Sequence, residues 1–412
     1  MKKILFILAL FAVNSAFSID RFVDPNLGSS NGTTLFTTIA TAVNASVNGD
    51  RILIVAGTYN EPTLTLSKSL TLLSQTAGTT INYNGNMVIS GFAGMKLQIL
   101  GFNLGVYSIS SNVISGGVAD NRAKVSIINC KMTNLSLDNN YYELNTALST
   151  MSGTTTFRFG NFVVSKTNNL YVYDEPNINL TGAKILIAAD TITSRLEFRN
   201  DDYPALIANC RCANLYFYQW NHITSNTNYI KNNQFLADSK IHFPNNPPAY
   251  NIEFSSNEFL GTYSFLNNAP YGCGGVGGGY GASDCNGCGQ CSGYGSSSSI
   301  FPNPDSPGFF RWTYNGIDLP CTIPTGAQPM VLTKITGTVG TNINSGNPNH
   351  DYYDVDLTIN DRGRTGGPFS ILNYVPSINP SGGKANIFDL EIPADLFPGQ
   401  SIDIKAKGYH KN

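Results

Sequence analysis

The sequence is poor in charge: Asp, Glu, Lys and Arg make up 13% of its 412 residues, and the net charge is −2. Proteins that bind nucleic acid through its phosphates carry a surplus of Lys and Arg, so this composition argues against a nucleic-acid partner. A surface rich in amides, hydroxyls and the 21 tyrosines instead suits polysaccharide or protein partners.

Familiar catalytic motifs are missing as well. The four histidines are scattered without zinc-protease spacing, and the chain has no Gly-x-Ser-x-Gly nucleophile elbow and no Gly-Lys-Ser/Thr phosphate loop. The sequence therefore gives no support for a zinc hydrolase, a serine hydrolase or a P-loop enzyme.

Long hydrophobic runs are absent except at the N-terminus. Lys2 and Lys3 precede the apolar run Ile4–Val13, and Ala16–Ser18 supplies small residues for a cleavage site. The run is too short to cross a bilayer as a mature helix, and no later stretch is long and apolar enough. We predict a signal peptide at residues 1–18, no membrane span, and a secreted protein that is extracellular or at the cell surface. A buried N-terminal strand is the alternative.

Helical periodicity is nearly absent too, with one exception at Phe36–Val43. Short β-rich runs follow from Ile52 to about residue 261, separated by Asn, Gly, Ser and Asp. Some of these runs repeat, since Ile127–Met132 aligns with Ile207–Cys212 and Ile230–Phe235. A repeat in the twenties with strands and few helices is typical of a β-solenoid, here of about ten coils over residues 45–260.

Recurring Asn and Cys residues mark the bends of the predicted coils. Asn tolerates the left-handed backbone conformation, so Asn129, Asn209 and Asn232 are expected at turns, hydrogen-bonded to the next coil. Cys130 and Cys210 are expected to be stacked turn or core residues.

Both ends of the chain resemble a known family. Phe22–Pro25, Phe36–Val43 and Gly49–Tyr59 are similar to the opening of pectin-lyase-like β-helix proteins, and Asn360–Pro368 resembles a closing segment of secreted bacterial members. The resemblance implies an all-β fold, a right-handed parallel β-helix with a short N-terminal capping helix.

The solenoid domain is expected at residues 19–375, with a Gly/Cys-rich insert at 272–299. Residues 376–412 are expected to form a C-terminal β cap, a hairpin of Ala385–Ile392 and Gln400–Ala406 around a Pro-Gly turn. Such a cap would protect the open strand edges of a solenoid.

The densest charge cluster on the predicted wall consists of Arg195, Glu197, Arg199, Asp201 and Asp202. The first three alternate with apolar residues, which places the charges on the outer face and the apolar side chains in the core. These five residues are the weak candidates for a catalytic site, because a solvated ladder of salt bridges accounts for them without any function and is the favoured interpretation.

The resemblance implies β-elimination of acidic polysaccharide, with Ca²⁺ held by carboxylates and an Arg or Lys as base. Calcium takes six to eight oxygen ligands, and Asp174-Glu175 and Asp201-Asp202 are the acidic pairs within the solenoid. A glycosidase would need a second carboxylate close to Glu197, for which Asp174 is the candidate. No catalytic motif of the family can be matched residue by residue. We therefore predict no cofactor, with Ca²⁺ as the alternative; a loop site for it would be the stretch with Asp351, Asp354, Asp356 and Asp361, for which solvated turn residues are the favoured interpretation.

Four cysteines lie in the insert: Cys273, Cys285, Cys288 and Cys291. Their spacing would suit zinc or an iron–sulfur cluster in a cytosolic protein. An exported protein meets an oxidising compartment, which favours two disulfides with three possible pairings.

Three function classes stay open. The chain is a binding or structural β-helix that contacts polysaccharide or protein, a polysaccharide lyase or glycosidase, or a protein whose Cys-rich loop has a disulfide- or metal-dependent role. The missing catalytic motifs and the low charge favour the first class, a protein that is not an enzyme.

Overall fold

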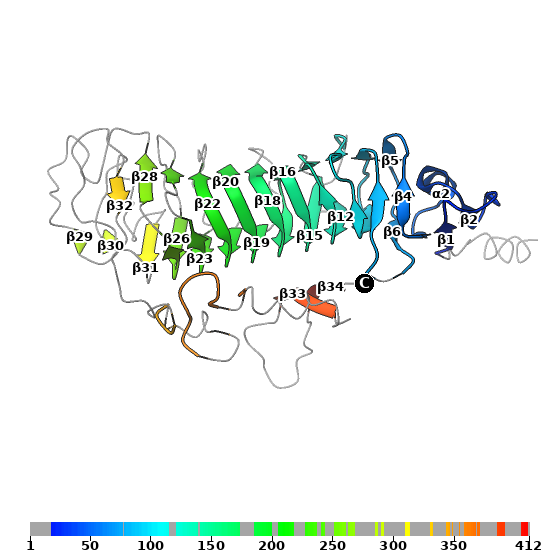
Figure 1. Cartoon of the computed structure of the whole chain (residues 1–412). Coiled ribbons are helices and arrows are strands. Elements are labelled where there is room, and N and C mark those ends of the chain that lie inside the picture. The colour runs from blue at the N-terminus through cyan, green and yellow to red at the C-terminus, as the bar shows by residue number, and fades with distance from the viewer. Residues whose placement is uncertain are drawn as a thin grey trace, which may run out of the picture.

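The computed structural model shows an elongated molecule built almost entirely of strands (Figure 1). It describes residues 18–76, 78–114, 121–138, 141–173, 185–199, 205–217, 227–236, 240–243, 251–260, 263–267, 285–286, 290–291, 310–313, 330–332, 343–346, 348, 354, 358–367, 369–370, 385–391 and 405–410.

Two long sheets form the walls of the molecule, and every strand pair in them is parallel except β28 with β32. The first sheet contains β1 (Asp20–Val23), β2 (Leu35–Phe36), β3 (Arg51–Ile54), β6 (Thr71–Ser74), β9 (Lys96–Leu100), β12 (Ala123–Ile128), β15 (Tyr142–Ala147), β17 (Gly160–Val163), β19 (Ile185–Ala188), β21 (Ala205–Ala208), β23 (Thr227–Lys231), β26 (Asn251–Ser255) and β31 (Phe310–Thr313). The second contains β4 (Gly57–Tyr59), β5 (Leu64–Leu66), β7 (Ile81–Tyr83), β8 (Met87–Ile89), β10 (Phe102–Asn103), β11 (Ile109–Ser111), β13 (Lys131–Met132), β14 (Leu135–Leu137), β16 (Thr150–Phe157), β18 (Lys166–Tyr173), β20 (Thr191–Arg199), β22 (Arg211–Phe217), β24 (Gln234–Phe235), β25 (Lys240–Phe243), β27 (Glu258–Phe259), β28 (Tyr263–Asn267) and β32 (Met330–Leu332).

Each coil of the chain adds one strand to the first sheet and either one long or two short strands to the second. The short strands form two columns that merge at β16, because β13 and β14 both pair with it, and they separate again after β22. From β3 to β26 the first sheet has ten such coils within the described residues. The predicted parallel β-helix of about ten coils is confirmed.

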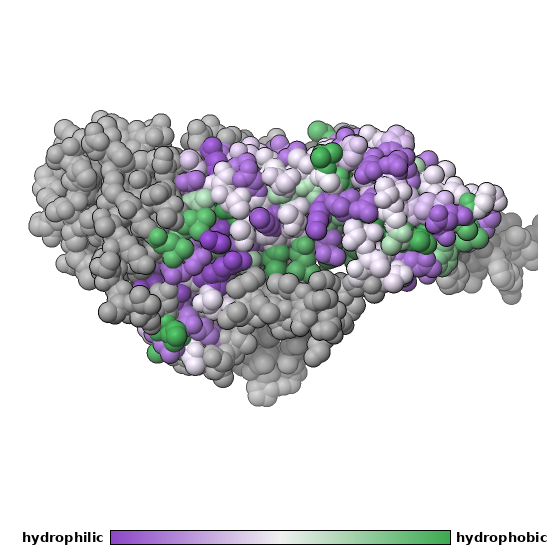
Figure 2. Space-filling view, in the orientation of Figure 1, coloured by the Kyte–Doolittle hydropathy of each residue, from purple (hydrophilic) through white to green (hydrophobic). Residues whose placement is uncertain are grey.

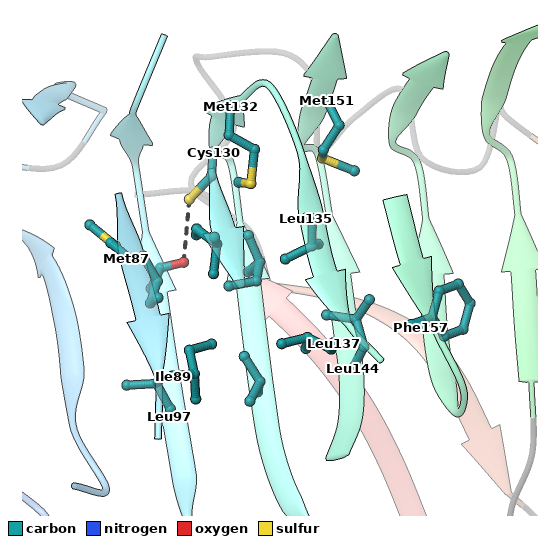
Figure 3. Packing of buried hydrophobic residues seen from close by; sticks show 14 of the residues in the cluster. Met87, Ile89, Leu97, Cys130, Met132, Leu135, Leu137, Leu144, Met151 and Phe157 are labelled. Carbon is teal, nitrogen blue, oxygen red and sulfur yellow. Dashed lines mark hydrogen bonds between the residues drawn. The ribbon is translucent and has the colours of Figure 1, made fainter. Parts of the chain in front are cut away.

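The core is one column of apolar side chains between the walls. Alternate residues of each strand point inward, as in β12, where Ala123, Val125 and Ile127 are fully buried. Figure 3 shows Met87, Leu97, Leu144 and other buried side chains from successive coils packed together. In this way stacking buries apolar surface that a single coil would expose.

The predicted N-terminal helix forms as α2 (Ile39–Ala45), and two charged side chains from later coils hold its ends. The Glu61 carboxylate accepts hydrogen bonds from the Ile39 and Ala40 amides at 2.7 and 2.8 Å. Lys68 Nζ donates to the carbonyl oxygens of Val43, Asn44 and Ser46. A negative group at the first turn and a positive group after the last both favour the helix dipole.

One corner of the β-helix carries a left-handed residue in seven successive coils. They are Asn129, Leu148, Val164, Ala189, Asn209, Asn232 and Ser256, with φ between 48° and 57°. The predicted turn position of the three asparagines is therefore confirmed. The residue after each of them points inward and forms a polar column: Cys130, Ser149, Ser165, Asp190, Cys210, Asn233 and Asn257, all at most 5% exposed.

The predicted partners of the corner asparagines were wrong in part. Asn209 Nδ2 does not bond to the next coil but donates to the carbonyl oxygens of Arg364 and Gly366, the first at 3.1 Å. Asn232 Nδ2 likewise donates to Asn360 Oδ1 and to the Asp361 carbonyl oxygen, at 2.7 and 2.8 Å. The coil-to-coil contacts belong to the inward column, where the Cys210 amide donates to Asn233 Oδ1 at 2.9 Å.

The segment that meets these corners, residues 358–367 and 369–370, is called the strap here. It lies along the side of the β-helix and contains the described residues of the predicted closing segment, 360–367. Its Phe369 packs on a small apolar cluster outside the core, which consists of Ala147, Val163, Leu186, Ala188 and Ala189. These residues sit on the outward side of the first sheet, so the strap covers apolar surface that the core does not use.

Two short hairpins are separate from the walls. Within the insert, β29 (Cys285–Asn286) pairs antiparallel with β30 (Gln290–Cys291). Near the C-terminus, β33 (Ala385–Glu391) pairs antiparallel with β34 (Lys405–His410), so the predicted hairpin forms, with its second strand beginning later than expected. None of the described helices has the length and hydrophobicity needed to span a membrane.

Candidate functional site

The described part of the predicted charge cluster, Arg195 and Glu197, lies on the outward face of β20, which the long strands β18 and β22 flank on either side. Leu196 and Phe198 of β20 are fully buried in the core, so Arg195 and Glu197 point outward, as the alternation predicts. Arg199 ends β20, and its side chain lies outside the described part of the structure, as do Asp201 and Asp202 entirely.

Parallel register aligns the outward residues of these strands into two rows. Glu197 lies between Tyr171 of β18 and Tyr216 of β22. Arg195 lies in the adjacent row, between Asn169 and Asn214. The site is therefore a patch of aromatic and amide side chains around one ion pair.

Arg195 occupies the centre of this patch. Its Nη2 forms an ion pair with Glu197 Oε2. Its guanidinium carbon lies 4.0 Å from the centroid of the Tyr216 ring and 5.9 Å from that of Tyr171. Both distances lie within the range of cation–π attraction. The Tyr173 ring adjoins Tyr171, with 6.1 Å between centroids.

Glu197 is buried, although the sequence suggested a solvated ladder of salt bridges. Only 2% of its side chain is exposed, against 31% for Arg195. Tyrosines occupy both neighbouring positions in its row, and the Arg195 guanidinium pairs with it. The carboxylate thus holds Arg195 in position, and the groups that a ligand can reach are Arg195 and the tyrosines.

We name Tyr171, Tyr173, Arg195, Glu197 and Tyr216 the tyrosine patch.

Sequence reasoning missed the tyrosines of this patch. Tyr171 and Tyr216 are 26 and 19 positions from Glu197 along the chain, and their proximity follows only from the register between coils. The alternation around Leu170 and Leu215 was the available signal, because it placed both tyrosines on an outer face.

The described residues show neither a calcium site nor a carboxylate pair at this patch. No group of three or more His, Cys, Asp or Glu among them could hold a metal ion. The positions that flank Glu197 in its row are tyrosines, and Asp174, the suggested second carboxylate, lies outside the described residues.

The acidic stretch near the strap has a structural role in the part that is described. Asp354 accepts hydrogen bonds from the amides of Asp361 and Gly367, the first at 3.1 Å. Asp361 Oδ1 accepts one from the Asn344 amide at 2.7 Å. The hydrogen bonds to these two carboxylates hold the strap in its conformation. Asp351 and Asp356 lie outside the described residues.

The cysteines of the insert are described only in part. Cys285 and Cys291 are directly opposite each other in the β29–β30 hairpin. Cys273 and Cys288 lie outside the described residues. The cysteines of the β-helix, Cys130, Cys210 and Cys212, are free and buried, as expected for core residues. Burial raises the pKa of the Cys130 thiol to about 12, so this thiol is protonated and unreactive.

Asp190, in the inward polar column, is the most unusual ionisable group of the described structure. It is fully buried; its Oδ1 accepts a hydrogen bond from the Ser165 amide at 2.6 Å, and its Oδ2 has no partner. Burial, together with the nearby Cys210 thiol, raises the pKa of Asp190 well above its ordinary value.

Comparison of the chain with protein-family models, with curated proteins and with solved structures found no match in any of the three. The geometry of the β-helix and of its outer faces is therefore the basis for assigning a function.

Proposed function

We propose that the protein is an exported β-helix that binds polysaccharide at the tyrosine patch and performs no catalysis there. The observation that carries this proposal is the position of the Arg195 guanidinium against the rings of Tyr216 and Tyr171. A sugar presents an apolar ring face and a rim of hydroxyl groups. The half-buried tyrosine rings offer apolar surface to the ring face, and guanidinium and amide groups offer hydrogen bonds to the hydroxyl groups.

The arrangement supports binding better than chemistry. The one described carboxylate of the patch is 2% exposed and is neutralised by Arg195, so it is poorly placed to attack or protonate a substrate. The patch is part of a rigid wall, because β18, β20 and β22 are joined by continuous parallel ladders. A rigid, preorganised surface lowers the entropic cost of binding an extended ligand.

Binding to a panel of plant and algal polysaccharides tests the proposal. We expect Tyr216→Ala to weaken binding about tenfold or more, because it removes an aromatic contact surface. Tyr229→Ala is the matched control, since Tyr229 also contacts a cation, Lys231 at 4.1 Å, but belongs to β23 in the other sheet. Equal binding by wild type and Tyr216→Ala would contradict the proposal.

A polysaccharide lyase or glycosidase is the second candidate, on the strength of Arg195 and Glu197. Incubation with polygalacturonate or alginate in the presence of Ca²⁺, followed by absorbance of unsaturated ends, distinguishes the two. Robust activity that is lost in Arg195→Ala would make the tyrosine patch an active site.

The insert is proposed to be stabilised by disulfides. The register of β29 and β30 favours Cys285–Cys291 among the three pairings, because directly opposed residues have Cα atoms about 4.5–5.5 Å apart, within the range that a disulfide spans. Cys273 and Cys288 then form the second pair. A metal-dependent role for the loop is the alternative.

A further inference from the structure

The first strand of the β-helix begins directly after the predicted signal peptide. β1 starts at Asp20, and the predicted cleavage after Ser18 makes Ile19 the first residue of the mature chain. Of the signal peptide, only Ser18 lies within the described residues, and it is exposed. β1, β2 and α2 lie at one end of the molecule, before the first full coil (Figure 1). The surroundings of Ile19 in this N-terminal cap therefore decide what a new N-terminus meets.

Ile19 is held at both its nitrogen and its carbonyl oxygen. Its amide donates a hydrogen bond to Asp50 Oδ1 at 2.9 Å, and its carbonyl oxygen accepts one from the Arg51 amide at 3.1 Å. The second bond extends the parallel ladder of β1 and β3, in which Asp20 pairs with Arg51. The ladder thus fixes the nitrogen of Ile19 against a carboxylate.

Asp50 is fully buried, and its two carboxylate oxygens have different partners. Oδ2 accepts hydrogen bonds from Arg21 Nε at 2.7 Å and from the Val47 amide at 3.0 Å. Oδ1 accepts the bond from Ile19. Burial raises the pKa of Asp50, but the hydrogen bonds from Val47, Ile19 and Arg21 outweigh burial and hold the pKa below its ordinary value. The carboxylate is therefore charged at neutral pH.

Cleavage of the Ser18–Ile19 bond changes the donor to Asp50 from a neutral amide to a cation. Hydrolysis by a signal peptidase consumes one water, which leaves a carboxyl group on Ser18 and an amino group on Ile19. The proton that the carboxyl group releases protonates the amine. A charge-assisted hydrogen bond is roughly twice as strong as a neutral one.

The two further N–H groups of the ammonium need acceptors as well. Ile19 is 42% exposed, and hydrophilic residues lie among hydrophobic ones on the visible surface at this end of the molecule (Figure 2). Water can therefore bond these two groups while the third faces Asp50.

We propose that removal of the signal peptide creates an α-ammonium group on Ile19 that pairs with Asp50 and completes the N-terminal cap of the β-helix. The precursor holds its first coil more weakly than the mature protein, because the same nitrogen is then a neutral amide. Processing is thereby coupled to the stability of the end at which the column of coils begins. The proposal rests on export, which is part of the proposed function, and is independent of the tyrosine patch.

N-terminal sequencing of the exported protein tests the position of cleavage. We expect Ile19 to be the first residue. A secreted chain that begins at any other residue would overturn the ion pair and leave export intact. A protein that keeps residues 1–18 would contradict export itself.

Two mature proteins that differ by one residue test the ion pair. One begins at Ile19 and the other at Ser18; both place a nitrogen donor opposite Asp50, but only the first donor is charged. At pH 7 we expect the Arg51 amide to exchange its hydrogen about tenfold more slowly in the protein that begins at Ile19.

The pH dependence of this difference identifies the ammonium. An α-amino group has a pKa of about 8 in an unfolded chain, and pairing with a carboxylate raises it. The difference should therefore be complete below about pH 8 and be lost as the pH rises through the folded pKa. The other charged groups beside this nitrogen are Arg21 and the pair of Asp20 and Arg51, which do not titrate in this range, and β2 and α2 contain none.

Two variants assign the difference to Asp50. Asp50→Asn keeps an acceptor without the charge and should abolish the difference between the two N-termini. Asp20→Asn is the control, because Asp20 adjoins Ile19 but is 43% exposed and pairs with Arg51 at 3.5 Å; it should preserve the difference. Equal exchange from the two N-termini at pH 7, or a difference that persists in Asp50→Asn, would overturn the proposal. If Asp50→Asn does not fold, the comparison of the two N-termini with Asp50 intact decides alone.

Discussion

At one corner of seven successive coils, one residue adopts a left-handed conformation that most side chains avoid. Asn209 and Asn232 accept it at low cost, whereas Val164, with φ 48°, is β-branched and does not. A left-handed conformation costs an ordinary residue about 1–2 kcal/mol. Val164 packs on the apolar cluster beneath the strap, so burial offsets this cost.

The buried Asp190 makes the stability of the protein dependent on pH. The pKa of Asp190 is higher in the folded protein than in the unfolded chain. The stability that its protonated carboxyl group contributes is therefore complete below the unfolded pKa of about 4, and it is lost as the pH rises through the folded pKa. We expect Asp190→Asn to leave the melting temperature nearly unchanged at low pH. At neutral pH it should stabilise the protein by about 1–3 kcal/mol, because the buried group no longer ionises.

Thermal unfolding of both proteins between pH 3 and 8 measures this difference. Asp138→Asn is the control, since Asp138 is 43% exposed and paired with Arg158; it should change stability by less than about 1 kcal/mol. A melting temperature for Asp190→Asn below that of wild type at pH 8 would show that the carboxylate is stabilising.

The position of a single residue could be predicted where the sequence pattern within one coil was enough to place it. Asn129, Asn209 and Asn232 were recognisable because Asn favours the left-handed turn. Leu148 and Val164 occupy the same corner against their own preference, and only the apolar cluster of several coils explains them.

Among the larger elements, the strap packs so closely that two of its glycines, Gly363 and Gly366, have no room for a side chain. A Cβ atom at Gly366 would overlap the Asp361 carbonyl oxygen and lie 2.6 Å from Asn232 Nδ2. We expect Gly366→Ala to destabilise the strap by about 1–3 kcal/mol, the cost of overpacking. Gly28→Ala is the control, since nothing lies within 4 Å of a Cβ there.

Hydrogen exchange of the amides in residues 358–367 reports on the docking of the strap. Faster exchange there in Gly366→Ala, with unchanged exchange in β12 and β15, is the expected result. If the amides of the strap exchange as slowly in Gly366→Ala as in wild type, the strap tolerates a methyl group there and docks less closely than these distances state.

The β29–β30 hairpin is the element on which the disulfide proposal depends. Intact mass after thiol alkylation, with and without reduction, should show that the four insert cysteines are blocked, and peptide mapping should link Cys285 to Cys291. A loop on the order of fifteen residues, closed by Cys273 and Cys288, would add about 3 kcal/mol of stability. Four alkylatable thiols with one bound metal ion would instead support the metal alternative.

For the whole molecule, the sequence predicted the parallel β-helix and its ten coils because each coil repeats the same local pattern of inward residues and turns. The tyrosine patch was only half predictable. Arg195 and Glu197 share one strand, but Tyr171 and Tyr216 come from other coils, and sequence does not fix the register between coils. The position of the strap on the β-helix could not be predicted from the sequence for the same reason.

The strap also determines the order in which the molecule can be completed. Coils contact only their neighbours, so they can fold one after another as the chain emerges from the ribosome or crosses a membrane. The bond from Asn209 to Gly366 joins residues 157 positions apart, and that from Asn232 to Asn360 joins residues 128 apart. The coils of β21 and β23 therefore wait for the strap, which comes more than a hundred residues later, before their outer corner is covered. Until the strap docks, this corner and the apolar residues beside it stay accessible to chaperones.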